Sequence, residues 1–215
     1  MTTPTDPAAL FSEWFGEVST ERCEANESPV LQAWEERTIE ASRNGSHDAF
    51  RELVNHHKDQ VYRFCLRWAL SAEDAEEVCQ DTFVRAYHAL GRYRPQGKFS
   101  TWLYQIALNL SRDRARSKTG KMSGLTFPIS KFSERDFPCR LPLPNESSVW
   151  SEDLRKLESG LNQLPTKLRE PLVLNAIDGL SYDECAEILS CSPRAIEGRI
   201  YRARRSLQQW WEELE

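Results

Sequence analysis

The feature that most constrains this fold is a long interruption in an otherwise helical pattern. The apolar periodicity disappears between Lys118 and Asn145, and the stretch "KMSGLTFPISKFSERDFPCRLPLPN" contains four prolines. A structureless segment of this length is uncommon inside a compact domain, and prolines favour an extended chain. The sequence therefore predicts two domains joined by a flexible, Pro-rich linker over residues 118–149.

Helical patterns occupy the chain on both sides of this linker. Apolar residues recur at three- and four-residue steps over 48–70 and 72–90, and again in a third segment that Ser100 or Thr101 is expected to cap. No stretch alternates with period two, so strands are not expected. We predict an all-α fold of two small helical domains, with a domain of residues 35–117 before the linker and one of 150–215 after it.

Two parts of the chain leave alternatives open. Residues 1–34 form an N-terminal extension that is either a docking or autoinhibitory segment or an idle tail. In the second domain, Pro171 interrupts an apolar helical pattern, so that helix is expected either to kink or to begin later.

A helix, a tight turn and a second helix are predicted for "GLSYDECAEILSCSPRAIEGRIYRARRSL" at 179–207. Gly179 closes the preceding helix, and Ser181 with Glu184 has the spacing of a capping box. Ser192 is a favourable N-cap and Pro193 a favourable first helical residue for the second helix.

The second helix of this motif separates apolar and basic residues onto opposite faces. At 100° per residue, one face carries Ile196, Ile200, Ala203, Leu207 and Trp210. The other face carries Arg194, Gly198, Arg199, Arg202 and Arg205. Such a helix suits the major groove of DNA, where arginine neutralises phosphates or bonds to guanine edges. The alternative is a basic surface helix that binds no ligand.

Charge is distributed unevenly along the chain, whose formal net charge is −5. Residues 91–121 hold eight bases and one acid, whereas residues 72–81 hold five acids and no base. A polyanion would meet the basic blocks rather than the mean charge. Aromatic residues lie among the bases of 91–116, an arrangement that suits stacking on single-stranded DNA, although Phe99 and Trp102 are also candidates for the core.

Several functional classes are disfavoured by the sequence. No apolar run is long enough for a membrane span, and the N-terminus lacks the features of a secretory signal. The cysteines are scattered without a CxxC pair, which favours reduced thiols and a cytoplasmic location. Because metal-ligand spacings, nucleophile motifs and phosphate-binding glycine loops are missing, we expect no enzyme activity, no metal and no cofactor.

Two blocks of this sequence, 43–118 and 161–207, resemble the extracytoplasmic-function sigma factors of bacterial RNA polymerase. The motifs "AEDAEEVCQDTFVRAY" and "FSTWLYQIALNLSRDRAR" are similar to the second conserved region of that family, and "LNQLPTKLREPLVLNAIDGLSYDECAEILSCSPRAIEGRIYRARRSL" is similar to the fourth. The resemblance implies a protein that binds core RNA polymerase and directs promoter recognition, DNA melting and transcription initiation. It also implies contacts with the clamp coiled coil of the largest subunit and with the β flap, and an anti-sigma factor as partner.

The resemblance implies three sets of site residues. Polymerase binding is expected at Asp74, Glu77, Gln80, Asp81 and Thr82. Contacts with the single-stranded minus-ten element are expected at Arg92, Tyr93, Lys98, Phe99, Trp102, Asn109, Arg112 and Arg116, with Asn109 beside an extruded base. Contacts with the minus-thirty-five duplex are expected at Ser192, Arg194, Ala195, Glu197, Gly198, Arg199, Arg202 and Arg205.

Two points remain open at the sequence level. Many members of the family have lysine and serine at the positions of Glu197 and Gly198, so the promoter sequence is not predicted. A helix-turn-helix regulator that is not a polymerase subunit is the alternative function. It would explain 179–207, but it would not explain the basic and aromatic segment 91–116 or the acidic helix before it.

Overall fold

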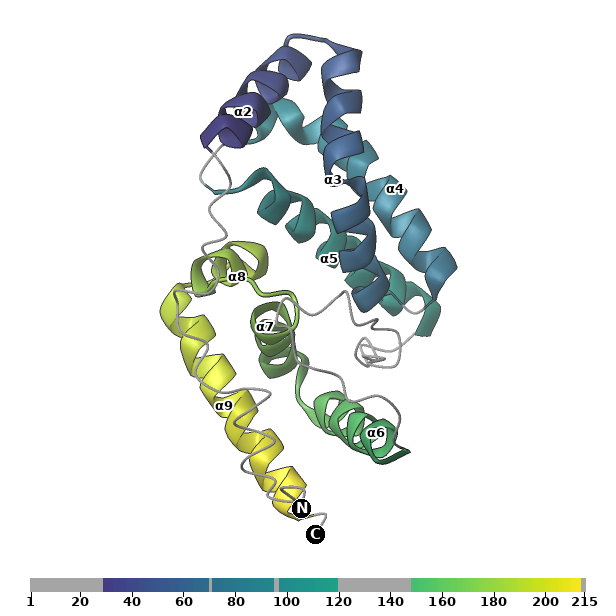
Figure 1. Ribbon diagram of the computed structural model, residues 1–215, viewed down its shortest axis with the longest axis vertical. Coiled ribbons are helices and arrows are strands. Elements are labelled where there is room, and N and C mark those ends of the chain that lie inside the picture. The colour runs from purple at the N-terminus through teal and green to yellow at the C-terminus, as the bar shows by residue number, and fades with distance from the viewer. Residues whose placement is uncertain (1–28, 70, 95–96, 120–147, 214–215) are drawn as a thin grey trace. The chain divides into compact units, whose positions relative to one another are not determined.

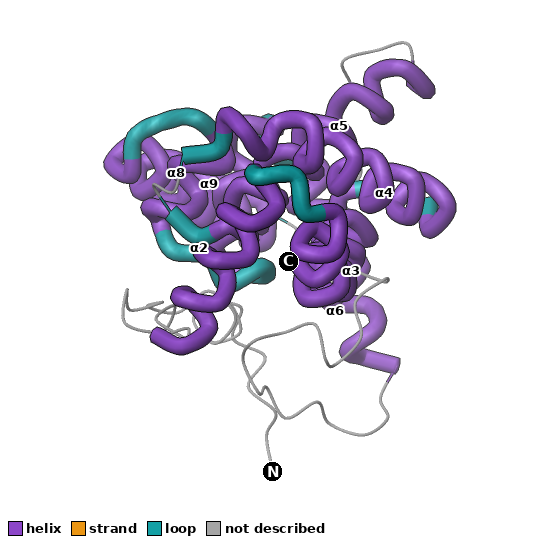
Figure 2. Tube along the Cα trace, turned by 90° about the horizontal axis from the view of Figure 1, so that it is seen from above, coloured by secondary structure: helices purple, strands orange, loops and turns teal. Residues whose placement is uncertain are grey.

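The computed structural model describes residues 29–69, 71–94, 97–119 and 148–213, and this part of the chain contains helices but no strands (Figures 1 and 2). The all-α prediction is therefore confirmed. The chain divides into two compact units, whose described parts are residues 29–119 and 148–213.

The first unit is built on a central helix. Helix α3 (His47–Trp68) contacts α2 (Pro29–Arg43), α4 (Ala72–Ala89) and α5 (Phe99–Thr119), and α4 also packs against α5. A short 3₁₀ helix, η2 (Leu90–Arg92), follows α4 directly. The largest side chains buried between these helices are Leu53, Phe64, Trp68, Phe99, Leu103 and Leu108.

Local capping explains why the chain turns where it does in this unit. Gly45 adopts a φ of +94° between α2 and α3, in the left-handed region that glycine enters without strain. Ser46 then caps α3, since its Oγ accepts a hydrogen bond from the Ala49 amide at 3.2 Å. Ser71 caps α4 in the same way, through the amide of Asp74 at 3.1 Å.

Two predicted boundaries differ from the structure, and most of a third predicted segment lies outside the described residues. Helix α5 begins at Phe99, so Ser100 and Thr101 are buried inside its first turn rather than capping it. Helix α2 begins at Pro29, so a boundary after residue 34 would divide a helix that packs on α3. The predicted linker lies outside the described residues, except for its ends in α5 and α6, and so do residues 1–28 of the extension.

The second unit places three helices around the C-terminal one. Helix α9 (Pro193–Glu212) contacts α6 (Ser148–Gln163), α7 (Thr166–Ala176) and α8 (Tyr182–Leu189). Side chains almost fully buried in this unit include Leu161, Leu172, Leu174, Ile188 and Ile196.

The helix-turn-helix motif forms as its capping residues predict. Gly179, at φ +69°, follows the end of α7. The capping box is complete, because Ser181 Oγ accepts from the Glu184 amide at 3.2 Å and Glu184 Oε2 accepts from the Ser181 amide at 2.8 Å. Ser192 caps α9, and Pro193 is its first residue.

Two further features shape the second unit. Pro171 lies buried inside α7, which begins at Thr166, so the helix does not start after the proline. Gly160 of α6 lies under the ring of Trp210, where an added Cβ would stand 2.7 Å from ring carbons. Glycine therefore allows α6 and α9 to approach closely at this point.

Candidate nucleic-acid interface

Helix α9 presents most of its arginines on the side opposite its packing face. Ile196, Ile200, Ala203 and Leu207 are buried against the other helices, as the sequence pattern predicts. The predicted duplex-binding residues that are exposed are Ser192, Arg194, Glu197, Arg202 and Arg205, and those that are half-buried are Ala195, Gly198 and Arg199.

The arginines of α9 differ in how they are held. Arg202 Nε donates to the carbonyl of Gly198 at 3.0 Å, within its own helix. Arg199 Nη1 lies 3.5 Å from Cys191 Sγ in the turn before α9, which fixes its guanidinium near the N-terminal end of the helix. Arg204 lies closer to the packing side, because its Nε and Nη2 atoms are shielded from solvent. Arg202 is exposed, whereas Arg199 and Arg204 are both half-buried, and of these three only Arg204 has guanidinium nitrogens that are shielded without a hydrogen-bond partner.

Tyr201 is an exposed residue of this face that the sequence analysis missed. Its relative exposure is 65 %. It follows Arg194 by seven residues and precedes Arg205 by four, so all three share one stripe of the helix. The helical wheel alone would have found it. An aromatic ring with a hydroxyl group in this position adds a hydrogen-bonding and stacking group to the arginine face.

The acidic face of α4 is only partly available to a partner. Glu77, Gln80 and Asp81 are exposed, with side-chain exposures of 58 % for Glu77 and 57 % for Asp81. Asp74 and Thr82 are buried, and Thr82 Oγ1 donates to the Val78 carbonyl at 2.7 Å inside the helix. Asp74 and Thr82 are therefore not accessible to a partner in this structure, and their predicted contact with the polymerase stays a prediction.

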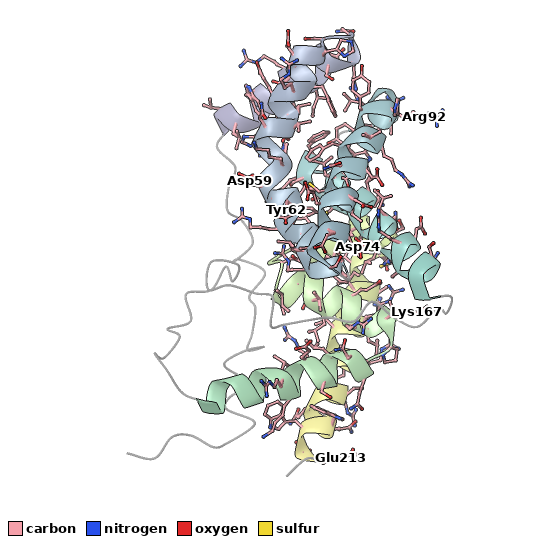
Figure 3. All side chains as sticks on the ribbon, turned by 90° about the vertical axis from the view of Figure 1, so that its right-hand side faces the viewer. Asp59, Tyr62, Asp74, Arg92, Lys167 and Glu213 are labelled. Carbon is pink, nitrogen blue, oxygen red and sulfur yellow. The ribbon has the colours of Figure 1, made fainter. Side chains whose placement is uncertain are left out.

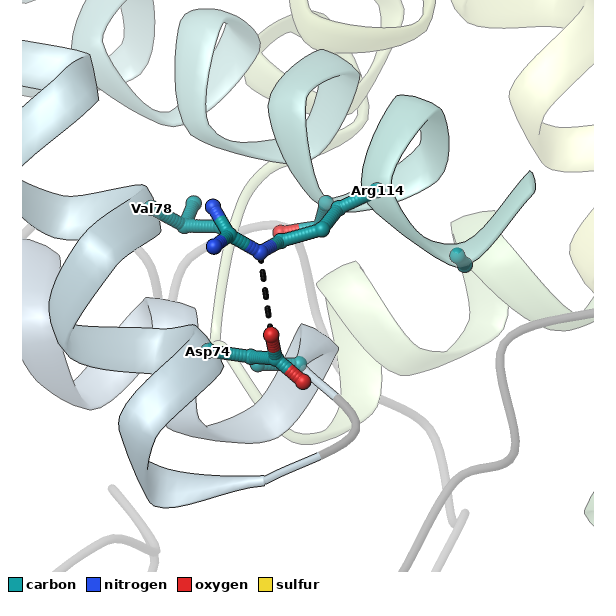
Figure 4. A pocket seen from close by; sticks show the side chains of 6 residues that line it. Asp74, Val78 and Arg114 are labelled. Carbon is teal, nitrogen blue, oxygen red and sulfur yellow. Dashed lines mark hydrogen bonds and ion pairs between the residues drawn. The ribbon is translucent and has the colours of Figure 1, made fainter. Parts of the chain in front are cut away.

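Asp74 is instead the centre of an ion cluster between α4 and α5. Its Oδ1 accepts from Arg114 Nε at 2.9 Å (Figure 4), and its Oδ2 accepts from the Ser71 hydroxyl at 3.1 Å. Arg114 also forms an ion pair with Glu77, and its Nη1 lies 3.9 Å from Asp81 Oδ2. One guanidinium therefore serves three carboxylates of α4.

Most aromatic residues of the basic block lie in the core of the first unit. Tyr93, Phe99 and Tyr104 are buried, and the ring centroids of Tyr93 and Phe99 are 5.4 Å apart. Trp102 is half-buried, with its ring centroid 4.7 Å from that of Tyr93. The prediction that Tyr93 and Phe99 stack on bases does not fit these positions, because their rings close the packing between the loop and α5.

The polar residues of the same block remain accessible in part. Arg92 is exposed at the end of η2, where Figure 3 labels it. Asn109 and Arg116 are exposed on α5, and Lys98 and Arg112 are half-buried. Arg112 Nη1 donates to Asn109 Oδ1 at 3.1 Å, and Arg116 forms an ion pair with Asp113 at 3.4 Å. Local pairs of this kind hold these side chains along the exposed side of α5.

Arg43 is a second residue that the sequence analysis missed. From α2, its Nε donates to the Leu90 carbonyl at 3.2 Å and its Nη2 donates to the Tyr93 carbonyl. Its guanidinium carbon also lies 5.8 Å from the centroid of the Tyr93 ring. Arg43 thus ties α2 to the start of the loop that leads into α5. A lone arginine at a helix end gives no sequence signal for such a role.

Within the described residues, two other kinds of site were not found. No group of three or more His, Cys, Asp or Glu side chains is arranged to hold a metal ion. None of the described helices combines the length and the apolar character needed to cross a membrane.

Two family models match this chain and correspond to the two units. Sigma-70 region 2 matches residues 53–120, from α3 to the end of α5. Sigma-70 region 4 matches residues 154–207, from α6 into α9.

Relatives extend this similarity over most of the chain. The ECF RNA polymerase sigma factor SigW of Bacillus subtilis is 33 % identical over 184 residues, which cover 83 % of this chain and 97 % of SigW. The RNA polymerase sigma-H factor of Pseudomonas aeruginosa is 30 % identical over 183 residues, covering 84 % and 95 %. The structure of CnrH in complex with the cytosolic domain of CnrY matches with a TM-score of 0.57 and 29 % identity, covering 84 % of this chain and 98 % of that one. The chain therefore belongs to the ECF family of RNA polymerase sigma factors.

Proposed function

We propose that this protein binds core RNA polymerase in the cytoplasm and directs initiation at a defined, signal-responsive set of promoters. The observation that carries the proposal is helix α9, whose apolar stripe is buried while Arg194 and Arg202 are exposed and Arg199 is half-buried beside Cys191. A capped helix-turn-helix with this polarity fits the major groove of duplex DNA. Here it would read the minus-thirty-five element.

The polymerase-docking surface in this proposal is the exposed part of α4. Glu77, Gln80 and Asp81 are accessible to a basic partner, and Val84, 55 % exposed, lies one turn further along the same helix. A small apolar centre beside acidic groups suits a protein partner that presents both basic and apolar side chains. We assign this surface to the clamp coiled coil of the largest subunit, and the helix-turn-helix unit to the β flap.

The single-strand surface in this proposal is narrower than the sequence predicts. It consists of the accessible residues Arg92, Lys98, Trp102, Asn109, Arg112 and Arg116. The amide of Asn109 can bond to the polar edge of an extruded base, while the arginines hold phosphates. Tyr93 and Phe99 would support this surface from beneath.

The proposal also includes two domains and a regulatory partner. We propose that α2–α5 and the α6–α9 unit each fold alone, with the region between them acting as a linker. CnrH, whose structure resembles this chain, was solved in complex with the cytosolic domain of CnrY. An anti-sigma factor is the corresponding partner proposed for this chain.

Run-off transcription with core RNA polymerase tests the proposed function directly. We expect the full-length chain to direct initiation at discrete start sites on fragmented genomic DNA, and mapping those sites would yield the promoter elements. Co-purification with core polymerase separates this function from the alternative regulator. A chain that binds DNA but neither co-purifies with the polymerase nor supports initiation would refute the sigma-factor proposal.

Substitution of the acidic face tests the docking surface. Glu77→Lys with Asp81→Lys should weaken the complex with core polymerase by reversing two exposed charges, without unfolding the protein. Glu52→Lys with Asp59→Lys is the matched control, because it makes the same charge change at exposed positions of α3. Equal affinity of the two double variants would remove α4 from the interface.

A further inference from the structure

Three carboxylates of α4 lie on one stripe of the helix that faces Arg114. Asp74, Glu77 and Asp81 are spaced by three and four residues, and Arg114 of α5 contacts all of them. The three acids differ in exposure, because the Asp74 side chain is 5 % exposed whereas Glu77 and Asp81 are more than half exposed. The cluster therefore has one buried member and two that a partner can reach.

The contact with Asp74 is structural. A buried carboxylate requires a counter-ion or hydrogen bonds, and Asp74 obtains them from Arg114 Nε (Figure 4) and from the Ser71 hydroxyl. The contacts with Glu77 and Asp81 have no such need, since both side chains are hydrated. Their effect is to place a fixed positive charge beside the two carboxylates that the proposed polymerase-docking surface offers to a basic partner.

Arg114 does not belong to the proposed single-strand surface. Asn109, Arg112 and Arg116 follow one another at three- and four-residue steps along α5. Arg114 is two residues from both Arg112 and Arg116, which turns it roughly 200° away from each of them around the helix. Its guanidinium is therefore held against α4.

We propose that Arg114 is an internal competitor that limits the affinity of the protein for core polymerase. Cationic side chains of the polymerase and the Arg114 guanidinium compete for the carboxylates of Glu77 and Asp81. This inference rests on the proposed function, since it takes α4 as the docking surface. A competitor and a structural residue predict opposite changes in affinity for core polymerase. Removal of a structural residue weakens binding, whereas removal of a competitor strengthens it.

The size of the effect follows from the exposure of the two acids. Ion pairs between solvent-exposed side chains are weak, and removing one or two of them corresponds to roughly a two- to five-fold change in affinity. The change in affinity should be largest at low ionic strength, because dissolved salt weakens interactions between exposed charges. The screening length is about 10 Å at 0.1 M salt.

The test measures the dissociation constant of full-length protein and core RNA polymerase for two matched double variants. Arg114→Gln with Asp74→Asn removes the competitor together with the buried acid that depends on it. Arg51→Gln with Asp48→Asn removes an exposed ion pair of α3 and causes the same charge change. We expect the first variant to bind roughly two- to five-fold more tightly than wild type at low salt, and the control to bind like wild type.

Two additional variants keep the test decisive. Adding Glu77→Gln and Asp81→Asn to the first variant should abolish its gain, because the carboxylates under competition are then gone. If the Arg114→Gln variant fails to fold, Arg114→Lys keeps a cation beside Asp74 but lacks the fork that spans several acids, and it should also bind more tightly than wild type. Unchanged or weaker binding by folded variants overturns the competitor role. Absence of binding by the wild-type protein instead refutes the proposed function.

Discussion

Helices α5 and α9 are both rich in arginine, but they place it differently. In α9, no carboxylate of the described residues lies within ion-pair distance of Arg194, Arg199 or Arg202. In α5, Arg114 is drawn into the interface with α4 by three acids, and Arg116 pairs with Asp113. The acids on neighbouring turns and helices thus decide which arginines remain available to DNA.

The same contrast applies to the apolar residues beside these arginines. On α9 the apolar stripe and the arginine face are separate, so the role of each side chain follows from its position on the helix. In the segment that leads into α5, the aromatic residues stand among the bases in sequence but point into the core in the structure. The roles of side chains are therefore easier to predict from the sequence in α9 than in the segment before α5, whose aromatic residues also form part of the core.

The largest expected effect concerns Phe99, which is 1 % exposed. Phe99→Ala should lower the free energy of unfolding of the first unit by about 3–5 kcal/mol, because it leaves a cavity beside Tyr93 and Trp102. Denaturant unfolding followed by circular dichroism measures this loss. Tyr62→Ala, on the surface of α3, is the control and should cost far less. If Phe99→Ala unfolds like wild type but loses single-strand binding, the ring acts as a stacking residue and the contrast between the two helices disappears.

The second prediction sharpens the role of the α9 arginines. If Arg199 bonds to a guanine edge, Arg199→Ala should weaken promoter binding by about 1–3 kcal/mol and relax the preference at one base pair. If it contacts only phosphate, the loss should be uniform across sequences and the salt dependence shallower. Binding of the holoenzyme to mapped promoter and scrambled duplexes at several salt concentrations distinguishes the two cases.

Arg204→Ala provides the matched comparison for this prediction. It removes the same charge from the same helix, but at a side chain that lies toward the packing side. A smaller loss of DNA affinity is expected for Arg204→Ala than for Arg199→Ala. Equal losses would mean that net charge, rather than the face of α9, determines binding.

How much of this molecule the sequence predicts depends on whether neighbours in sequence are also neighbours in space. The caps at Ser181 and Ser192 and the buried stripe of α9 depend on contacts within a turn or two, so they were predicted correctly. Phe99, the first residue of α5, packs on His57 of α3 and on Tyr93, and buried Asp74 of α4 pairs with Arg114 of α5, so both positions depend on contacts between separate segments. No local pattern contains that information.

The same reason explains the residues that sequence reasoning missed. Arg43 reaches carbonyls 47 and 50 residues further along the chain, which no spacing rule reveals. Tyr201 is different, because its spacing from Arg194 and Arg205 alone places it on the arginine stripe. His57 is buried and hydrogen-bonded to Glu35, 22 residues earlier in the chain, at 2.8 Å, whereas the adjacent His56 is exposed.

The third prediction tests how α9 is anchored on its packing side. Gly160→Ala would place a methyl group 2.7 Å from the Trp210 ring, so the ring or the two helices must shift, and the second unit should lose about 1–3 kcal/mol of stability. Gly198→Ala is the control, because its added Cβ meets open space on α9 and helical alanine is favoured over glycine by about 1 kcal/mol. Opposite shifts in unfolding free energy are expected. Equal shifts would contradict the close approach of α6 and α9.

The smallest expected effect concerns the acids of α8, the first helix of the helix-turn-helix motif. Burial, and then the neighbouring Glu184, raise the pKa of Glu187 above its ordinary value of 4.5. A carboxyl group with a raised pKa in the folded state favours folding when protonated, and this contribution is lost as the pH rises through that pKa.

Glu187→Gln should therefore stabilise the protein slightly at pH 7, by less than about 0.5 kcal/mol, and have no effect below pH 4. Thermal unfolding at both pH values checks this, with Glu197→Gln on the exposed face of α9 as control. Stabilisation that persists at low pH would mean that the charge of Glu187 is not its cause.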